Sequence, residues 1–180
     1  MLDYEITALT PRDFGALTHL EEKLFGSKGE KTLGAFYLRL CCDFYGDTSF
    51  VARADGEPVG YILTFVRDRE AYCSTLAIVP EFQRTRVVHY LIQASIRSIA
   101  YRVDTLWFTV SPENADARAL HATLGARELE THLDYFGQGE SRIVSRIERP
   151  AFEKLRARME RLGLLERPVA SVPAPASVVA

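Results

Sequence analysis

Three runs of β-forming residues follow one another between residues 48 and 79, with only short turns between them. The first two, TSFVARA and PVGYILTFV, flank Asp55-Gly56, a pair that is typical of a tight hairpin turn. The third, AYCSTLAIV, ends at Pro80, and the chain becomes helical from about Arg86. A sheet with these apolar runs must be covered by other elements, so the pattern requires helices packed on it.

The segment before this sheet predicts one strand and two helices. Residues 4–9 are predicted as a strand, and Thr10-Pro11 is a favourable start for a helix that ends near Phe25. A second helix is predicted over residues 33–44 because its apolar residues recur at helical spacing. We expect three members of that stripe, Phe36, Cys41 and Phe44, to lie in the core.

The segment after the sheet predicts further strands over 104–110, 126–136 and 141–147, with Gly137-Gln138-Gly139 as a hairpin connection. Helices are predicted over 114–124, where Gly125 is a typical C-terminal cap, and from Pro150 onward. The order indicates one mixed α/β domain over residues 1–166 with a single central sheet. Residues 167–180 are rich in Pro, Ala, Ser and Val, and we expect a poorly ordered tail.

Charge and cysteine content narrow the function classes. The 180 residues carry 22 basic and 24 acidic side chains, so there is no basic excess of the kind that nucleic-acid binding needs. The three cysteines form no CxxC pair and the histidines no ligand cluster, so we expect no metal site and a reducing, cytoplasmic location. We expect no membrane segment, because no stretch approaches ~20 apolar residues and no signal peptide is recognisable.

The segment LAIVPEFQRTRVVHYL, residues 76–91, carries the first functional signal. A strand that leads through a short polar loop into a helix presents unpaired backbone N–H groups at the positive end of the helix dipole, which favours a phosphate. Arg84 and Arg86 flank Thr85 in the loop, and their guanidinium groups are suited to a pyrophosphate. The alternative is a solvated loop that only begins a core helix.

Together with Asn114, Ala117, Leu120, His121 and Leu124-Gly125-Ala126, this segment resembles the GNAT family of N-acetyltransferases. In that family a strand ends in V-x-P-E-[YF] and leads into the loop [QR]-x-x-G-x-[GA]; residues 79–88 match these two motifs here. The family's later motif is N-x-x-A-x-x-L-Y-x-x-L-G-F, which the second set of residues matches. The resemblance covers roughly residues 48–147. It implies a mostly antiparallel mixed sheet of about seven strands with helices on both faces. It also implies acetyl or short acyl transfer from coenzyme A to a primary amine of a small molecule or peptide.

The resemblance also implies which residues form the site. A backbone N–H near Leu76, Ala77 or Ile78 would polarise the thioester carbonyl, and His121, at the position of the family's tyrosine, would protonate the leaving thiolate. Tyr37 and Tyr135 would contact the acceptor, and no residue is assigned as general base. The remaining residues expected to bind the cofactor are Gln83, Arg84, Thr85, Arg86, Val87, Val88, Asn114 and Ala117.

Two departures from the family pattern leave alternatives open. Arg86 and Val88 stand where the family has glycine, which lets backbone approach phosphate without a Cβ. In the first alternative, Arg86 replaces the lost contacts, and acetyl-CoA or another acyl-CoA still binds. In the second, the acyl group is carried by a carrier protein. In the third, the domain is a non-catalytic ligand sensor or interaction module. His121 is either the general acid that protonates the leaving thiolate or a residue that only packs against the sheet. A homodimer is an open alternative to a monomer.

Overall fold

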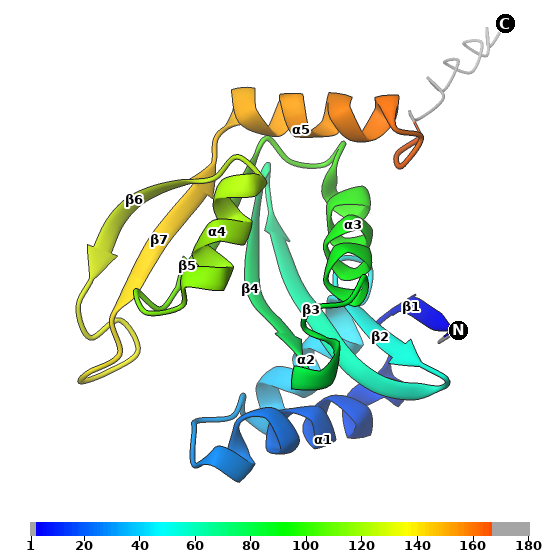
Figure 1. The fold of residues 1–180 in the computed structure, drawn as a ribbon, viewed down its shortest axis with the longest axis vertical. Coiled ribbons are helices and arrows are strands. Elements are labelled where there is room, and N and C mark those ends of the chain that lie inside the picture. The colour runs from blue at the N-terminus through cyan, green and yellow to red at the C-terminus, as the bar shows by residue number, and fades with distance from the viewer. Residues whose placement is uncertain (1–2, 167–180) are drawn as a thin grey trace, which may run out of the picture.

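The computed structural model describes residues 3–166 and arranges them as a seven-stranded sheet with helices on both faces (Figure 1). The strand order is β1-β2-β3-β4-β5-β7-β6. β4 and β5 run parallel, and all other neighbours are antiparallel, which confirms the predicted mixed sheet. The tail predicted at residues 167–180 lies outside the described residues.

The elements follow the predicted order closely. The strands are β1 (Tyr4–Ala8), β2 (Phe50–Ala54), β3 (Glu57–Arg67), β4 (Glu70–Ile78), β5 (Thr105–Val110), β6 (Arg127–His132) and β7 (Arg142–Ile147). The α-helices are α1 (Phe14–Leu24), α2 (Ala35–Phe44), α3 (Val87–Ile99), α4 (Ala115–Thr123) and α5 (Arg149–Arg161). Short 3-10 turns at Pro11–Asp13, Gly26–Lys28 and Pro80–Phe82 precede or follow the helices.

Strand alternation assigns each helix to a face of the sheet. Tyr61 of β3 donates a hydrogen bond from its hydroxyl to Glu21 of α1, whereas Thr64, three residues on, bonds Ser95 of α3 at 2.8 Å on the opposite face. α1 and α2 therefore cover one face. α3, α4 and α5 cover the other, where buried residues from α3, β5 and α5 pack together.

The residues predicted to form turns and caps adopt the backbone conformations expected of them. Asp55 and Gly56 both have positive φ, 49° and 87°, between β2 and β3. Gly125 has φ 93° after α4, and Ala126 donates from its N–H to the carbonyl of His121. These left-handed positions favour glycine, aspartate or asparagine, so the short connections are determined locally.

The predicted burial of α2 is wrong in part. The helix buries Leu38, Cys41 and Cys42, whereas Phe36 is 96% exposed and Phe44 is 73% exposed. Phe36, Leu40 and Phe44 follow one another at four-residue intervals and share the outer side of the helix. Apolar residues surround most of this helix, so periodicity alone does not determine which side faces the sheet. Cys41 is in the core as expected.

We predict that Cys41 and Cys42 are unreactive in the folded protein. Burial raises the pKa of Cys41 to about 12 and that of Cys42 to about 11, so little thiolate, the reactive form, is present at pH 8. Alkylation by iodoacetamide at this pH should be at least about 100-fold slower than in urea, measured by peptide mass spectrometry. A Cys41–Cys42 disulfide, or equal rates with and without urea, would contradict the predicted inertness of the two thiols.

Candidate active site

β4 and β5 separate part-way along their length. The two strands pair only from Glu70 to Cys73, opposite Thr105 to Phe108. On the other edge of β4, Thr75 pairs with Leu63 and Cys73 with Thr64, which leaves Ser74 as one extra residue in the strand. Such a bulge bends a strand and interrupts its pairing. The second half of β4 therefore diverges from β5, and a gap opens in the middle of the sheet.

The separated half of β4 directs backbone groups into this gap. The N–H of Val79 donates to the carbonyl of Val59 at 2.9 Å, and hydrogen-bonded pairs alternate along an antiparallel ladder. Leu76 and Ile78 therefore point their N–H and C=O groups away from β3, while Ala77 points its own toward β3. The Gln83 side chain donates to the Ile78 carbonyl at 3.1 Å, which agrees with this orientation.

A central cavity of about 610 Å³ passes through the sheet at the gap. Its walls come from β4 and β5, from α4 on one face, and from the α1–α2 connection on the other. Four of the predicted site residues line it, namely Leu76, Asn114, Ala117 and His121. Lys31 of the α1–α2 connection forms an ion pair with Glu140, just before β7, so the two segments are joined where both reach the cavity.

The predicted phosphate loop, residues 80–88, lies beyond the walls of this cavity and leads into α3. Thr85 organises it, because its hydroxyl donates to the Phe82 carbonyl at 2.7 Å and accepts from the Val87 N–H at 3.3 Å. The next N–H groups of the first turn, which include that of Val88, have no acceptor within the helix. The loop thus presents a helix N-terminus at the end of β4.

Charge and backbone conformation at this loop both suit an anion. Arg84 and Arg86 are exposed, and neither forms an ion pair with the described residues. Arg86 has φ −68° and ψ −13°, ordinary right-handed values, and no residue of this loop has positive φ. The residues that stand in place of glycine therefore add side chains here without straining the backbone.

α4 begins at Asn114, whose side-chain oxygen accepts from the Ala117 N–H at 3.0 Å. This cap fixes the start of the helix and leaves the side-chain amide of Asn114 at the cavity wall. The same helix carries His121 on the side that faces β5. Both segments of the sequence that carry the resemblance thus meet at the gap between β4 and β5.

The His121 ring stacks on Phe108, with centroids 4.2 Å apart and planes at 25°. Burial lowers its pKa from 6.5 to about 4, despite the opposing effect of Glu128, so the ring is neutral at neutral pH. Its Nδ1 atom is buried without a hydrogen-bond partner among the described residues, which leaves Nε2 as the atom that a group in the cavity can reach.

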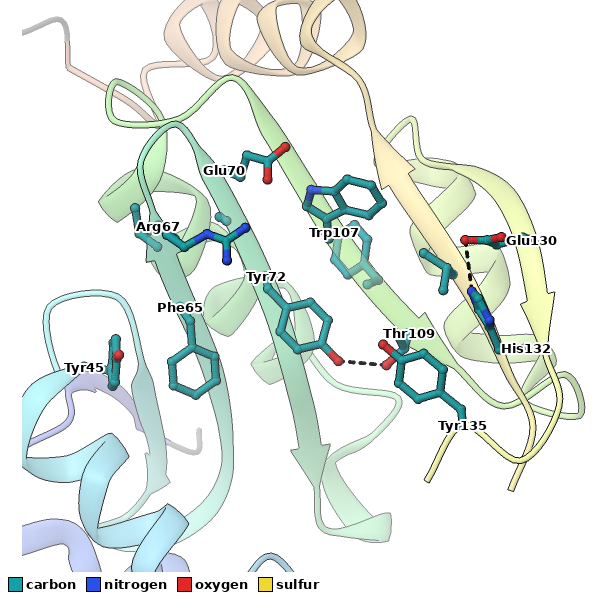
Figure 2. A pocket seen from close by; sticks show the side chains of 14 residues that line it. Tyr45, Phe65, Arg67, Glu70, Tyr72, Trp107, Thr109, Glu130, His132 and Tyr135 are labelled. Carbon is teal, nitrogen blue, oxygen red and sulfur yellow. Dashed lines mark hydrogen bonds and ion pairs between the residues drawn. The ribbon is translucent and has the colours of Figure 1, made fainter. Parts of the chain in front are cut away.

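The two tyrosines predicted to contact the acceptor lie in different places. The Tyr37 hydroxyl is 2.8 Å from the Ser74 hydroxyl, so Tyr37 supports the bulge, and burial raises its pKa to about 12. Tyr135 lies at the rim of a neighbouring recess, near a hydrogen bond of 2.9 Å between Tyr72 and Thr109 (Figure 2). This second hydroxyl pair, which sequence reasoning missed, spans β4 and β5 where they begin to separate. In the sequence DTLWFTV, Trp107 and Thr109 alternate with apolar neighbours, and this pattern could have indicated that both side chains share one face of the strand.

Glu21 is a buried carboxylate in the wall of the central cavity that the sequence did not single out. One oxygen accepts from the Tyr61 hydroxyl and the other from the Leu33 N–H. Glu21 therefore attaches the α1–α2 connection to β3. Among residues 3–166 no group of three or more His, Cys, Asp or Glu side chains is arranged to hold a metal, and no helix is long and apolar enough to cross a membrane.

Comparison with known proteins finds relatives that are named as N-acetyltransferases. An N-alpha-acetyltransferase of Sulfurisphaera tokodaii is 26% identical over 110 residues, which make up 53% of this chain and 66% of the relative. The ribosomal protein bS18-alanine N-acetyltransferase of Salmonella typhimurium is 31% identical over 117 residues, 64% of this chain and 69% of that enzyme.

Solved structures agree on the fold. The diaminobutyrate acetyltransferase of Paenibacillus lautus, solved with L-2,4-diaminobutyric acid and coenzyme A, superposes with a TM-score of 0.68 at 16% identity, over 83% of this chain and 96% of that one. The family model described as "Acetyltransferase (GNAT) family" matches residues 15–126, more than half of the chain. The chain is therefore a member of the GNAT family of N-acetyltransferases.

Proposed function

We propose that this chain transfers an acetyl group from acetyl-CoA to the α-amine at the N-terminus of a polypeptide. The gap between β4 and β5 carries the proposal, because it has unpaired N–H groups along one wall and leads to a helix N-terminus with two arginines. The two curated relatives above are named for acetylation of an N-terminal α-amine or of a ribosomal protein alanine, which supports a polypeptide acceptor. A cytoplasmic location is part of the same proposal.

The residues present fit coenzyme A in three ways. The N–H groups of Leu76 and Ile78 face the gap and suit the amide groups of an extended pantetheine arm. The first turn of α3 and the guanidinium groups of Arg84 and Arg86 suit a pyrophosphate. Asn114 and Ala117, on the opposite wall, limit the width of the channel. The regular backbone of residues 80–88 favours retained coenzyme A binding over a carrier protein, because the missing glycines leave the helix start intact.

In the reaction, the acceptor nitrogen forms a bond to the thioester carbonyl carbon, and the bond from that carbon to sulfur breaks. The net change moves one proton from nitrogen to sulfur. A backbone N–H of the separated part of β4 would stabilise the negative charge that develops on the carbonyl oxygen. His121, as a neutral imidazole, would donate a hydrogen bond from Nε2–H to the departing sulfur and stabilise it, while the proton lost by the acceptor nitrogen passes to that sulfur through solvent in the cavity.

The proposed function is tested by incubating the purified chain with acetyl-CoA and an alanine-terminated peptide that contains an internal lysine. Tandem mass spectrometry should place the acetyl group on the α-amine, and the same peptide with a blocked N-terminus should stay unmodified. Transfer only to lysine or only to a small diamine would overturn the polypeptide α-amine as acceptor. Tight coenzyme A binding without transfer to any amine would favour a sensor.

Arg86→Ala should weaken coenzyme A binding by about 1.5–3 kcal/mol, roughly ten- to a hundredfold, because it removes a charged hydrogen bond to the pyrophosphate. Titration calorimetry with free coenzyme A measures this directly. Arg97→Ala, an exposed arginine in the last turn of the same helix, is the matched control and should bind normally. Unchanged affinity in Arg86→Ala would show that this guanidinium does not compensate for the missing glycine. Val88→Gly should bind coenzyme A as well as, or better than, the original chain.

His121→Ala should lower kcat by about 10²–10⁴-fold, the usual contribution of a positioned proton donor. Coenzyme A affinity should change little, because the ring is assigned to the sulfur and not to the pyrophosphate. His121→Tyr, which restores the family's residue, should keep much of the activity, and His89→Ala on the exposed side of α3 is the control. Normal turnover of His121→Ala, with chemistry rate-limiting, would assign His121 a packing role.

A further inference from the structure

A second cavity of about 660 Å³ lies on the sheet face that carries α1 and α2, beyond the edge of α2 (Figure 2). Besides Phe108, five aromatic side chains line it, from α2's C-terminal end, β3, β4, β5 and the β6–β7 connection. We name it the aromatic recess, and the five are Tyr45, Phe65, Tyr72, Trp107 and Tyr135. Apart from Tyr135, which the sequence predicts at the acceptor, these rings have no part in the proposed transfer reaction, and the volume is far larger than an amine requires.

The aromatic recess adjoins the central cavity. Phe108 and Thr109 line both, and the hydrogen bond of 2.9 Å between Tyr72 and Thr109 marks the boundary. Thr109 is the first residue of β5 beyond the paired segment, so the boundary coincides with the start of the gap. A molecule whose amine reaches the gap at Thr109 therefore has the recess directly beside it.

The walls of the recess are held in place before anything binds. The Tyr45 and Phe65 rings meet edge to face with centroids 4.6 Å apart, and the Arg146 guanidinium lies 4.4 Å from the centre of the Trp107 ring. Rings fixed in this way lose little conformational freedom when a further apolar group packs against them. The recess is thus a preformed apolar site.

The charged groups at the rim do not select for an occupant of one charge sign. Arg67 and Glu70 stand on the β3–β4 side, and Glu130 is paired with His132 at 2.9 Å on the β6 side, as Figure 2 shows. Opposite charges of similar number favour a neutral occupant, with polar atoms left at the rim. The chemistry of the wall therefore fits a large apolar side chain, and an aromatic ring best of all.

We propose that the aromatic recess binds the side chain of the third residue of the polypeptide acceptor and selects a large apolar or aromatic residue there; this rests on the proposed function. Trp107 precedes Thr109 by two residues of β5, about 7 Å along the strand. An extended acceptor advances by the same rise, and its first and third side chains point to the same side. With the amine at Thr109, the third side chain lies over Trp107 and Tyr72.

The test compares two peptides that differ at one position, Ala-Ser-Phe and Ala-Ser-Gly followed by the same polar sequence. The original chain should acetylate the phenylalanine peptide with a kcat/KM about 10- to 100-fold higher, the effect of burying one phenyl ring. Moving the phenylalanine to position 2 should remove the advantage, because that side chain points away from the sheet. Equal kcat/KM for the two peptides would overturn the proposal.

Trp107→Leu and Tyr45→Ala should each reduce the preference for phenylalanine to less than about threefold while acetylation of the glycine peptide continues at its original rate. The glycine peptide thus reports on folding and chemistry in each variant. Phe44→Ala is the matched control, since Phe44 precedes Tyr45, is 73% exposed and does not line the recess. A preference that persists in both recess variants would overturn the assignment. Transfer to a small diamine but to neither peptide would overturn the polypeptide acceptor, and the recess assignment with it.

Discussion

The extra residue in β4, Ser74, is the constraint on which the site depends. It breaks the regular ladder with β3 and coincides with the last pair between β4 and β5, Cys73 with Phe108. Without that separation the N–H groups of Leu76 and Ile78 would be paired with β5, and no cavity would cross the sheet. Two hydroxyl contacts lie on either side of this point, Tyr37 with Ser74 and Tyr72 with Thr109. They hold the two strands and α2 in the arrangement that keeps the gap open.

Three titratable side chains beside the gap, those of His121, Cys73 and Tyr37, are uncharged at neutral pH, and burial is the common cause. Burial lowers the pKa of His121 to about 4 and raises those of Cys73 and Tyr37 to about 12. The exposed arginines of the phosphate loop lie outside the cavity. Burial of these groups lowers the local dielectric and so strengthens the effect of nearby backbone dipoles on a charge that develops there. The arginines suited to an anion thus lie apart from the neutral side chains beside the reacting centre.

Most of the fold could be predicted from local signals, and the exceptions have physical reasons. Asp55-Gly56, Pro80, Asn114 and Gly125 mark boundaries through their own backbone preferences, so they act independently of the rest of the molecule. The exposed Phe36 and Phe44 were placed in the core because α2 is apolar on most sides, and only packing determines its orientation.

The site was predictable where a motif contributes it and unpredictable where three-dimensional packing creates it. The residues of α4 and the loop before α3 were found by spacing and resemblance. The bulge at Ser74 has no sequence signal of its own, since neither serine nor its neighbours require it. The aromatic recess combines rings from five separate segments, and the carboxylate of Glu21 lies within an ordinary helical repeat. The pKa of His121 depends on the surrounding burial, which spacing does not reveal.

The loop before α3 has a thermodynamic consequence that follows from its ordinary backbone angles. Arg86 and Val88 adopt right-handed conformations that a residue with a Cβ occupies without strain, whereas a glycine there would leave the unfolded chain with many more conformations. Each such replacement lowers the entropy of the unfolded chain and stabilises the folded one by about 0.4–1 kcal/mol. The same restriction acts on any locally opened state of the loop. The loop therefore keeps its folded conformation independently of any anion, and a return to glycine would lower the stability of the fold rather than the affinity for the anion.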